Sequence, residues 1–167
     1  MSTRQDSPAE RLQLCHGKDP EVLLVTGLGS GFVRPAPGTW GSLMALGIWW
    51  FLLAALPWWG QLATIALTLM LGTWLVARVG QRYGVNDDPG IVVDEFAGLW
   101  LTLLAAAPTL PAALGGFALF RLFDIWKPWP VRLTERKVPG AWGVMLDDLV
   151  AGVLAAGVLQ ISLRLFS

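Results

Sequence analysis

The chain has 167 residues, of which 54% are hydrophobic and only 14% are charged, whereas a soluble domain carries about 25% charged residues. This composition is typical of an integral membrane protein and excludes a disordered chain. Twelve Lys and Arg balance twelve Asp and Glu without a basic stripe, which disfavours nucleic-acid binding, and a single cysteine excludes an internal disulfide.

The first 21 residues are polar and charged, and they lack the basic-then-apolar order of a cleaved signal peptide. We predict that residues 1–21 form a cytoplasmic segment and that residues 22–167 form a membrane-embedded domain. This domain opens with a glycine-rich stretch that includes Ser30 and leads to a helix start near Thr39. Backbone N–H groups at a helix start suit an anion such as phosphate. The alternative is a flexible lead-in with Thr39 as the helix N-cap.

Four apolar segments without charge follow along the chain. They cover residues 40–56, 62–77, 96–120 and 149–163. A helix that spans a bilayer needs about 20 mostly apolar residues, so each segment is a candidate membrane helix. Two tryptophans between the first two segments favour a turn at the membrane interface. We therefore predict an all-α fold, an integral membrane helical bundle.

The third segment is long for a single crossing, and Pro108 and Pro111 interrupt it. Each proline removes a backbone donor and favours a turn. We predict a short helical hairpin with arms at about Val92–Ala107 and Ala112–Trp126. The arms either span the bilayer with their charged ends below the headgroups or form a re-entrant hairpin. The bundle then has about five membrane helices.

The distribution of Lys and Arg supports this topology. Counted over successive segments outside the apolar helices, they number 4, 0, 2, 0, 5 and 1 from the N-terminus to the C-terminus. Cytoplasmic loops are the ones enriched in Lys and Arg. The alternation therefore predicts a multi-pass chain with a cytoplasmic N-terminus.

Acidic residues stand at the ends of three apolar helices, and the predicted topology places all of them at the cytoplasmic border. They are Asp94, Glu95, Asp124, Asp147 and Asp148. Charges at such depths are costly and usually functional. A hard divalent ion such as Mg²⁺ prefers oxygen ligands and often binds carboxylates together with a substrate phosphate. No His or Cys lies near these helices, which disfavours zinc, haem and iron–sulfur centres.

The alternative for these acids is a plain structural one: Asp94 and Asp147 are helix N-caps, and the acid after each is favoured by the helix dipole. Gly98 and Gly152, which follow the two acidic pairs, are expected to let the helices pack closely. Close packing would bring the carboxylates together.

Arg121, Asp124 and Lys127 follow one another at intervals of three residues. Residues three apart lie on the same side of a helix, so Arg121 and Asp124 are expected to be neighbours, with Lys127 on the same side. Such a group could hold a metal-bound phosphate. The alternative is an Arg–Asp pair that anchors the helix end.

These features together favour an enzyme that acts on a phosphorylated lipid with Mg²⁺. The sequence disfavours phosphatase mechanisms that use a catalytic histidine or cysteine, because its single histidine and single cysteine, His16 and Cys15, lie in the polar N-terminal segment. One alternative is a small cation channel or transporter that uses the border carboxylates. Another is a scaffold whose acids pair with lysines of a partner.

Five short blocks, in order from about residue 22 to residue 152, carry a family resemblance. They are Gly27-x-Gly29-Ser30-Gly31, Pro37-Gly38-Thr39-x-Gly41-Ser42, Asp94-Glu95-Phe96-x-Gly98, Arg121-x-x-Asp124-x-x-Lys127-Pro128 and Gly143-x-Met145-x-Asp147-Asp148-x-x-Ala151-Gly152. Together they resemble the phosphatidylglycerophosphatase A family. Ala141 stands where a glycine is expected in the last block.

The resemblance implies a Mg²⁺-dependent enzyme of the bacterial inner membrane with its active site at the cytoplasmic face. It would hydrolyse the terminal phosphomonoester of phosphatidylglycerophosphate to phosphatidylglycerol and phosphate. Residues 22–167 are then the catalytic domain, and membrane lipids surround it. Oligomeric state, the number of ions and the choice between direct water attack and a phosphoaspartyl intermediate stay open.

Roles follow for the matched residues. The predicted catalytic residues are Asp94, Glu95, Asp124 and Asp148. The predicted metal ligands are Asp94, Glu95, Asp147 and Asp148, with Asp124 as a further ligand or as the partner of Arg121. The predicted substrate-binding residues are Ser30, Thr39, Arg121 and Lys127.

Overall fold

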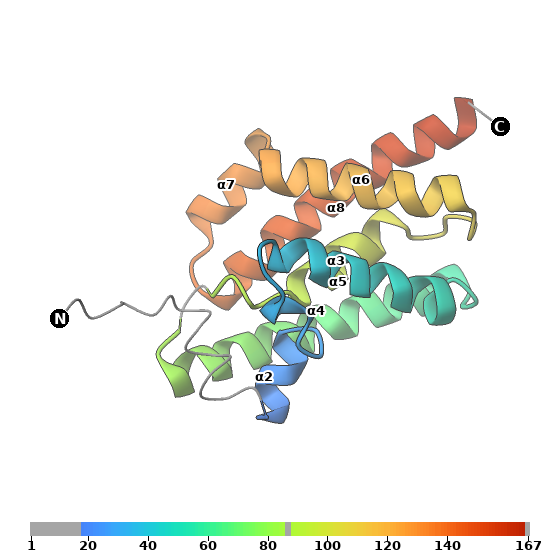
Figure 1. Ribbon diagram of the computed structural model, residues 1–167. Helices are drawn as coiled ribbons and strands as arrows, with labels where there is room; N and C mark the ends of the chain where they lie inside the picture. The colour runs from blue at the N-terminus through green and yellow to red at the C-terminus, as the bar shows by residue number, and fades with distance from the viewer. Residues whose placement is uncertain (1–17, 86–87, 166–167) are drawn as a thin grey trace.

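The computed structural model describes residues 18–85 and 88–165, which form seven α-helices and, within those ranges, no β-strand (Figure 1). The helices are α2 (Pro20–Val25), α3 (Pro37–Ile48), α4 (Trp58–Tyr83), α5 (Val93–Thr102), α6 (Leu110–Trp126), α7 (Trp129–Lys137) and α8 (Ala141–Leu165). A short 3₁₀ turn, η1 (Ser30–Phe32), precedes α3, and a π-helical turn, η2 (Trp49–Leu53), extends it. The predicted all-α class is confirmed.

Two helices, α4 and α8, are long and apolar enough to cross a membrane. They belong to the second and fourth predicted segments, and they point to membrane association. Helix α8 begins at Ala141, about two turns before the apolar segment, because helical structure continues through its acidic pair. The five crossings that the sequence predicts are not shown by these two helices and stay a prediction.

The predicted hairpin is present as α5 and α6, so a single continuous third helix is excluded. Thr109 is the N-cap of α6, and Pro111 occupies its first turn, where the missing N–H costs nothing. Helix α5 ends at Thr102 rather than Ala107, and the chain turns through Ala105, which has a positive φ of 57°. Ten helical residues extend only about 15 Å, about half of a bilayer's hydrocarbon core.

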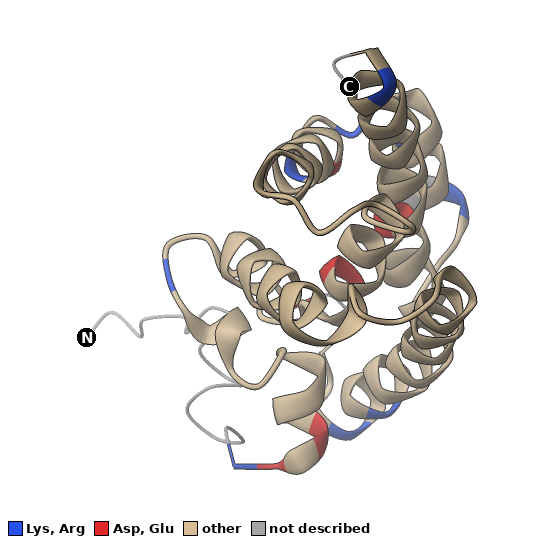
Figure 2. Ribbon diagram, turned by 90° about the vertical axis from the view of Figure 1, so that its right-hand side faces the viewer, with Lys and Arg blue, Asp and Glu red and all other residues tan. Residues whose placement is uncertain are grey.

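Helix α5 lies in the interior of the bundle, packed against α3, α4 and α8 (Figure 2). Most of its residues are buried. The indole of Trp100 donates a hydrogen bond of 2.9 Å to the carbonyl of Ala45 on α3. A Cβ on Gly152 of α8 would overlap the carbonyl oxygen of Gly98, and one on Gly98 would lie 2.7 Å from the carbonyl oxygen of Asp148. These glycines therefore allow the close helix contact that the sequence predicts.

Helix α2 is fixed to the end of α4 by polar contacts. Asp19 caps α2 through the N–H of Glu21, at 2.8 Å, and also accepts a hydrogen bond of 2.7 Å from the Tyr83 hydroxyl. Arg82 lies 3.1 Å from the Asp19 carboxylate, and Arg78 lies 2.6 Å from that of Glu21. Of the predicted cytoplasmic segment 1–21, residues 1–17 lie outside the described ranges.

Candidate active site

Three carboxylates from two neighbouring helices converge in the bundle. Asp94 and Glu95 stand in the first turn of α5, and Asp148 projects from α8. Each offers an oxygen atom, and these oxygens all lie within 4.8 Å of one another. Oxygen ligands lie 2.0–2.6 Å from Mg²⁺ or Ca²⁺, so ligand atoms this close to one another can share one ion.

The alternative in which the acids are only N-caps is wrong. The N-cap position of α5 is Val92, and Asp94 is the second helical residue. Asp147 and Asp148 lie in the interior of α8, which begins at Ala141. Their carboxylates are placed by the packing of α5 on α8 and not by capping.

Two oxygens of this group need a positive partner. Within the described part of the chain, Asp94 Oδ1 and Glu95 Oε2 are buried and accept no hydrogen bond. A buried carboxylate oxygen without a partner is strongly unfavourable. A bound cation would satisfy both oxygens, and an all-oxygen donor set is the set that hard divalent ions select. The three acids therefore fit a metal ion.

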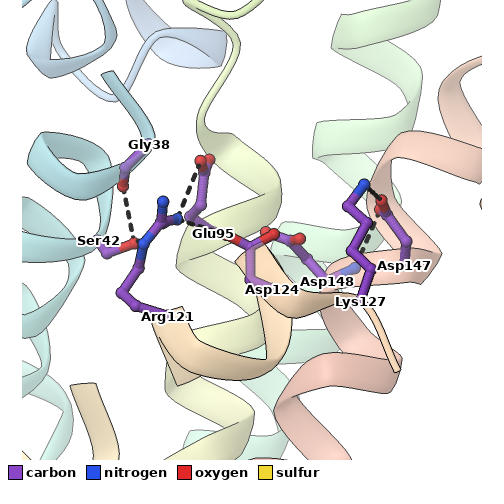
Figure 3. Close-up of polar contacts among 8 residues, drawn as sticks. All are labelled: Gly38, Ser42, Glu95, Arg121, Asp124, Lys127, Asp147 and Asp148. Atoms are coloured by element: carbon purple, nitrogen blue, oxygen red, sulfur yellow. Dashed lines mark hydrogen bonds and ion pairs between the residues drawn. The ribbon is translucent and has the colours of Figure 1, made fainter. Parts of the chain in front are cut away.

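Arg121 and Asp124 are neighbours on α6, as the sequence predicts. Arg121 Nη1 lies 2.6 Å from Asp124 Oδ2 and 3.7 Å from Glu95 Oε1. The guanidinium group also approaches Ser42 of α3, at 3.5 Å from Oγ (Figure 3). Asp124 in turn lies beside Asp148 (Figure 3).

Lys127 departs from the predicted arrangement, because it follows the last residue of α6. It is the C-cap, with a positive φ of 46°, and its ammonium group lies 3.0 Å from Asp147 Oδ2 (Figure 3). Asp147 also accepts the N–H of Asp148 at 3.0 Å. Asp147 is therefore ion-paired, and its predicted role as a metal ligand stays a prediction.

A cavity of about 560 Å³ opens beside these groups. Its polar lining consists of Asp94, Glu95, Asp124, Lys127, Asp147 and Asp148. The segment between α7 and α8 forms the rest of the wall, at residues 138–140 and 143–144. A Cβ on Gly143 would overlap the carbonyl oxygen of Val138, so the glycine lets this wall close on itself. The cavity therefore combines five acidic side chains and the ammonium group of Lys127 with apolar residues.

Comparison with known proteins shows to which family the chain belongs. The sequence profile named "Phosphatidylglycerophosphatase A" matches residues 23–163. The chain belongs to this family. It is 41% identical over 164 residues to phosphatidylglycerophosphatase A of Escherichia coli (strain K12), covering 95% of this chain and 91% of the relative. The corresponding protein of Haemophilus influenzae is 40% identical over 153 residues, covering 90% of this chain and 91% of the relative.

A Bacteroides thetaiotaomicron protein is also similar, at 42% identity over 139 residues, covering 79% of this chain and 86% of the relative. It carries the provisional description of a phosphatidylinositol-3-phosphatase. No solved structure matches the chain. Membership of the phosphatidylglycerophosphatase A family confirms the predicted activity, the hydrolysis of phosphatidylglycerophosphate in phospholipid biosynthesis, and decides against the channel and scaffold alternatives.

Three of the four residues predicted to bind substrate, Ser30, Thr39 and Arg121, are not among the residues that line the cavity, although Arg121 contacts Glu95 and Asp124 of its lining. Ser30 lies in η1, where its hydroxyl donates to the carbonyl of Thr26 at 3.3 Å. Thr39 lies inside the first turn of α3, whose N-cap is Ala36 rather than Thr39. The helix already starts at Pro37, so the N-cap lies three residues earlier than the sequence predicts.

Gly38 and Ser42, in contrast, adjoin the acidic group, and sequence reasoning gave neither a role. Ser42 Oγ donates to the carbonyl of Gly38 at 2.8 Å and contacts Arg121. A Cβ on Gly38 would overlap Glu95 Oε1. Both residues belong to a block that carried the family resemblance. Membership of that block was the signal in the sequence, whereas their closeness to Glu95 and Arg121 depends on how the helices pack.

Proposed function

We propose that this chain hydrolyses the terminal phosphomonoester of phosphatidylglycerophosphate with one Mg²⁺ held by Asp94, Glu95 and Asp148. The observation that supports this proposal is the convergence of the three carboxylates, with oxygens within 4.8 Å and two buried oxygens left without a hydrogen bond. Family membership supplies the substrate, and the donor set supplies the ion class.

Each polar residue of the cavity then has a distinct task. When bound, Mg²⁺ supplies neutralisation of the phosphate charge and acidification of a water molecule. Lys127 donates hydrogen bonds to phosphate oxygens, and Asp147, 3.0 Å away, orients it. Asp124 lines the cavity without belonging to the triad, so we assign it as the base that accepts the proton of the attacking water.

Arg121 serves the site from the opposite side to Lys127. Its guanidinium group contacts Asp124 and Glu95, and it also forms part of a second hollow, on the outer face of α6. This hollow has a volume of about 860 Å³ and is otherwise lined by Ala118, Leu122, Ile125 and Trp126. We assign the hollow to the acyl chains of the substrate, because it joins an apolar surface to a cation of the acidic site.

The membrane placement follows from the same features. Helices α4 and α8 cross the bilayer, α3 with η2 forms a third segment, and α5 and α6 form the short hairpin, re-entrant at α5. The cavity then faces the cytoplasm of a bacterial inner membrane, where the Lys and Arg of the flanking segments lie. The length and apolar character of α4 and α8 support this placement.

Phosphate release from phosphatidylglycerophosphate by the purified protein in detergent tests the proposal. We expect phosphate release with Mg²⁺, no release in EDTA, and recovery of release when Mg²⁺ is restored. Asp94→Asn, Asp124→Asn and Asp148→Asn should each abolish release while the protein still inserts. Glu21→Gln, which changes a carboxylate on α2, is the matched control and should stay active.

Two results would contradict the proposal. Full activity in EDTA would show that the reaction needs no metal ion. Wild-type turnover by all three aspartate variants would show that these acids do not form the active site. Phosphatidylinositol 3-phosphate is the comparison substrate, because a relative carries that description. Faster release from it than from phosphatidylglycerophosphate would reassign the substrate while leaving the site intact.

A further inference from the structure

The backbone of the first turn of α3 lies directly against the Glu95–Arg121 pair. A Cβ added to Gly38 would overlap Glu95 Oε1 and would lie 3.1 and 3.3 Å from the two terminal nitrogens of Arg121. Real Cβ atoms essentially never approach another heavy atom closer than 3.0 Å. No residue other than glycine therefore fits at position 38 while Glu95 keeps its place.

The overlapping atom is the end of a side chain and not a piece of backbone. A larger residue at position 38 would therefore leave the helices where they are and push the Glu95 carboxylate aside. Gly41, one turn further along α3, differs in this respect, because its Cβ would lie 2.6 Å from the Cβ of Val92. Position 41 is limited by packing of the core, whereas position 38 is limited by a functional carboxylate.

The Glu95 carboxylate has little room to adjust without changing its role. Its side chain is 11% exposed, and its Oε1 is 3.7 Å from Arg121, while its Oε2 is buried and accepts no hydrogen bond within the described ranges. One oxygen thus faces α3 and Arg121, and Glu95 also belongs to the triad with Asp94 and Asp148. Moving Oε1 away from α3 rotates the whole carboxylate.

We propose that Gly38 is a positioning residue, whose lack of a side chain lets the start of α3 fix the Glu95 carboxylate for metal binding. The inference rests on the proposed function and extends it to a helix that contributes no ligand. Ser42 supports the arrangement, because its hydroxyl donates to the Gly38 carbonyl at 2.8 Å and so fixes the turn that carries the glycine.

The test compares Gly38→Ala with Gly47→Ala. Both residues lie on α3, and a Cβ on Gly47 meets nothing within 4 Å, so the control makes the same chemical change in open space. The readouts are thermal unfolding, Mn²⁺ binding followed by electron paramagnetic resonance, and phosphate release. Alanine favours helix over glycine, so neither variant should unfold at a lower temperature than the wild type.

We expect Gly38→Ala to bind Mn²⁺ at least tenfold more weakly and to release phosphate at least tenfold more slowly, whereas Gly47→Ala matches the wild type in every readout. Wild-type Mn²⁺ affinity in Gly38→Ala would overturn the proposal. An equal loss in both variants would also overturn it, because the effect would then come from the helix and not from Glu95.

A double-mutant cycle identifies Glu95 as the residue through which Gly38 acts. Glu95→Asp shortens the side chain by one methylene and leaves room for a Cβ at position 38. In the Glu95→Asp background, Gly38→Ala should weaken Mn²⁺ binding less than threefold further. A further loss as large as in the wild type would overturn the proposal.

The proposed function and this inference fail in different ways. If the wild type binds Mn²⁺ but releases no phosphate from phosphatidylglycerophosphate, the weaker binding of Gly38→Ala still supports the role of Gly38. If the wild type binds no Mn²⁺, both are overturned.

Discussion

Lys127 combines a charge that faces the cavity with a backbone conformation that side chains disfavour. Its φ of 46° places it in the left-handed region, which costs a residue other than glycine about 1 kcal/mol. Its ammonium group ion-pairs with Asp147 and lines the cavity. A residue kept at this position against its backbone preference indicates a task for the side chain.

Lys127→Gly removes the side chain and relieves the backbone strain together. The buried Asp147 carboxylate loses its ion pair, which costs more than the strain relief returns, so the variant should unfold at a lower temperature than the wild type. Phosphate release should fall roughly 10- to 100-fold, since a charge-assisted hydrogen bond contributes about 1.5–3 kcal/mol. Unfolding and phosphate-release measurements on the same preparation check both expectations. Undiminished turnover would show that Lys127 has no contact with the phosphate.

The acids of the site could be identified one by one from the sequence, because a charge beside an apolar helix is costly and usually functional. Predicting Asp94, Glu95 and Asp148 as site residues required no knowledge of how the helices pack. The positions of Gly38 and Arg121 did need it, because their relation to Glu95 depends on how α3 and α6 pack around α5. No spacing along the chain encodes that relation.

At the scale of elements, the contact between α5 and α8 sets the distance between the carboxylates. Gly152→Ala would place a Cβ against the carbonyl of Gly98 and force the two helices apart. Overpacking of this kind costs about 1–3 kcal/mol, and we expect a lower unfolding temperature together with weaker Mn²⁺ binding. Gly157→Ala on the same helix is the control, because its Cβ meets nothing within 4 Å. Unchanged Mn²⁺ binding in Gly152→Ala would show that this contact does not set the site.

The attachment of α2 to α4 should depend on pH through Asp19. The hydrogen bond from Tyr83, aided by the charge of Arg82, lowers the pKa of the Asp19 carboxyl group. Folding therefore gains stability from this group above its unfolded pKa of about 3.9, and the gain is lost as pH falls through the lower folded pKa. Asp19→Asn keeps the cap but removes the titration. The gap between the unfolding temperatures of the wild type and this variant should shrink below about pH 4, and a constant gap would contradict the assignment.

Helix boundaries show where sequence patterns stop being informative. Pro108, Pro111 and Thr109 fixed the turn and the start of α6 through local chemistry, so the hairpin was predictable. The early end of α5 was not, because nothing in Leu103–Ala107 opposes a helix, and tertiary packing turns the chain there. Asp147 and Asp148 looked like the start of a helix because they precede an apolar segment, yet α8 begins at Ala141.

For the whole molecule, metal binding should stabilise the folded state. The three proposed ligands lie together only when α5 packs on α8, so an ion bound there would favour folding. At a free concentration 100 times its Kd, a ligand adds about 2.7 kcal/mol. We expect Mg²⁺ to raise the unfolding temperature of the wild type, EDTA to reverse the shift, and Asp148→Asn to show little of it. An equal shift in Asp148→Asn would place the ion elsewhere.

The apolar segments of the sequence predicted an all-α fold correctly, and the sequence also predicted correctly that acids from separate helices meet. It did not show which helices are neighbours. Helix α5 is short and central, while the two long helices α4 and α8 pack on it. Hydropathy ranks segments by length and apolar content, so it gave no reason to place α5, the shorter arm of the hairpin, in the middle of the bundle.

The acidic centre draws on α5, α6 and α8, and Asp148 lies on the last helix that the structure describes. A ribosome that has just completed α6 has therefore made only part of the centre. On the proposed mechanism we expect the nascent chain to gain activity only when α8 packs in place. Products of premature termination before Asp148 should therefore release no phosphate from phosphatidylglycerophosphate.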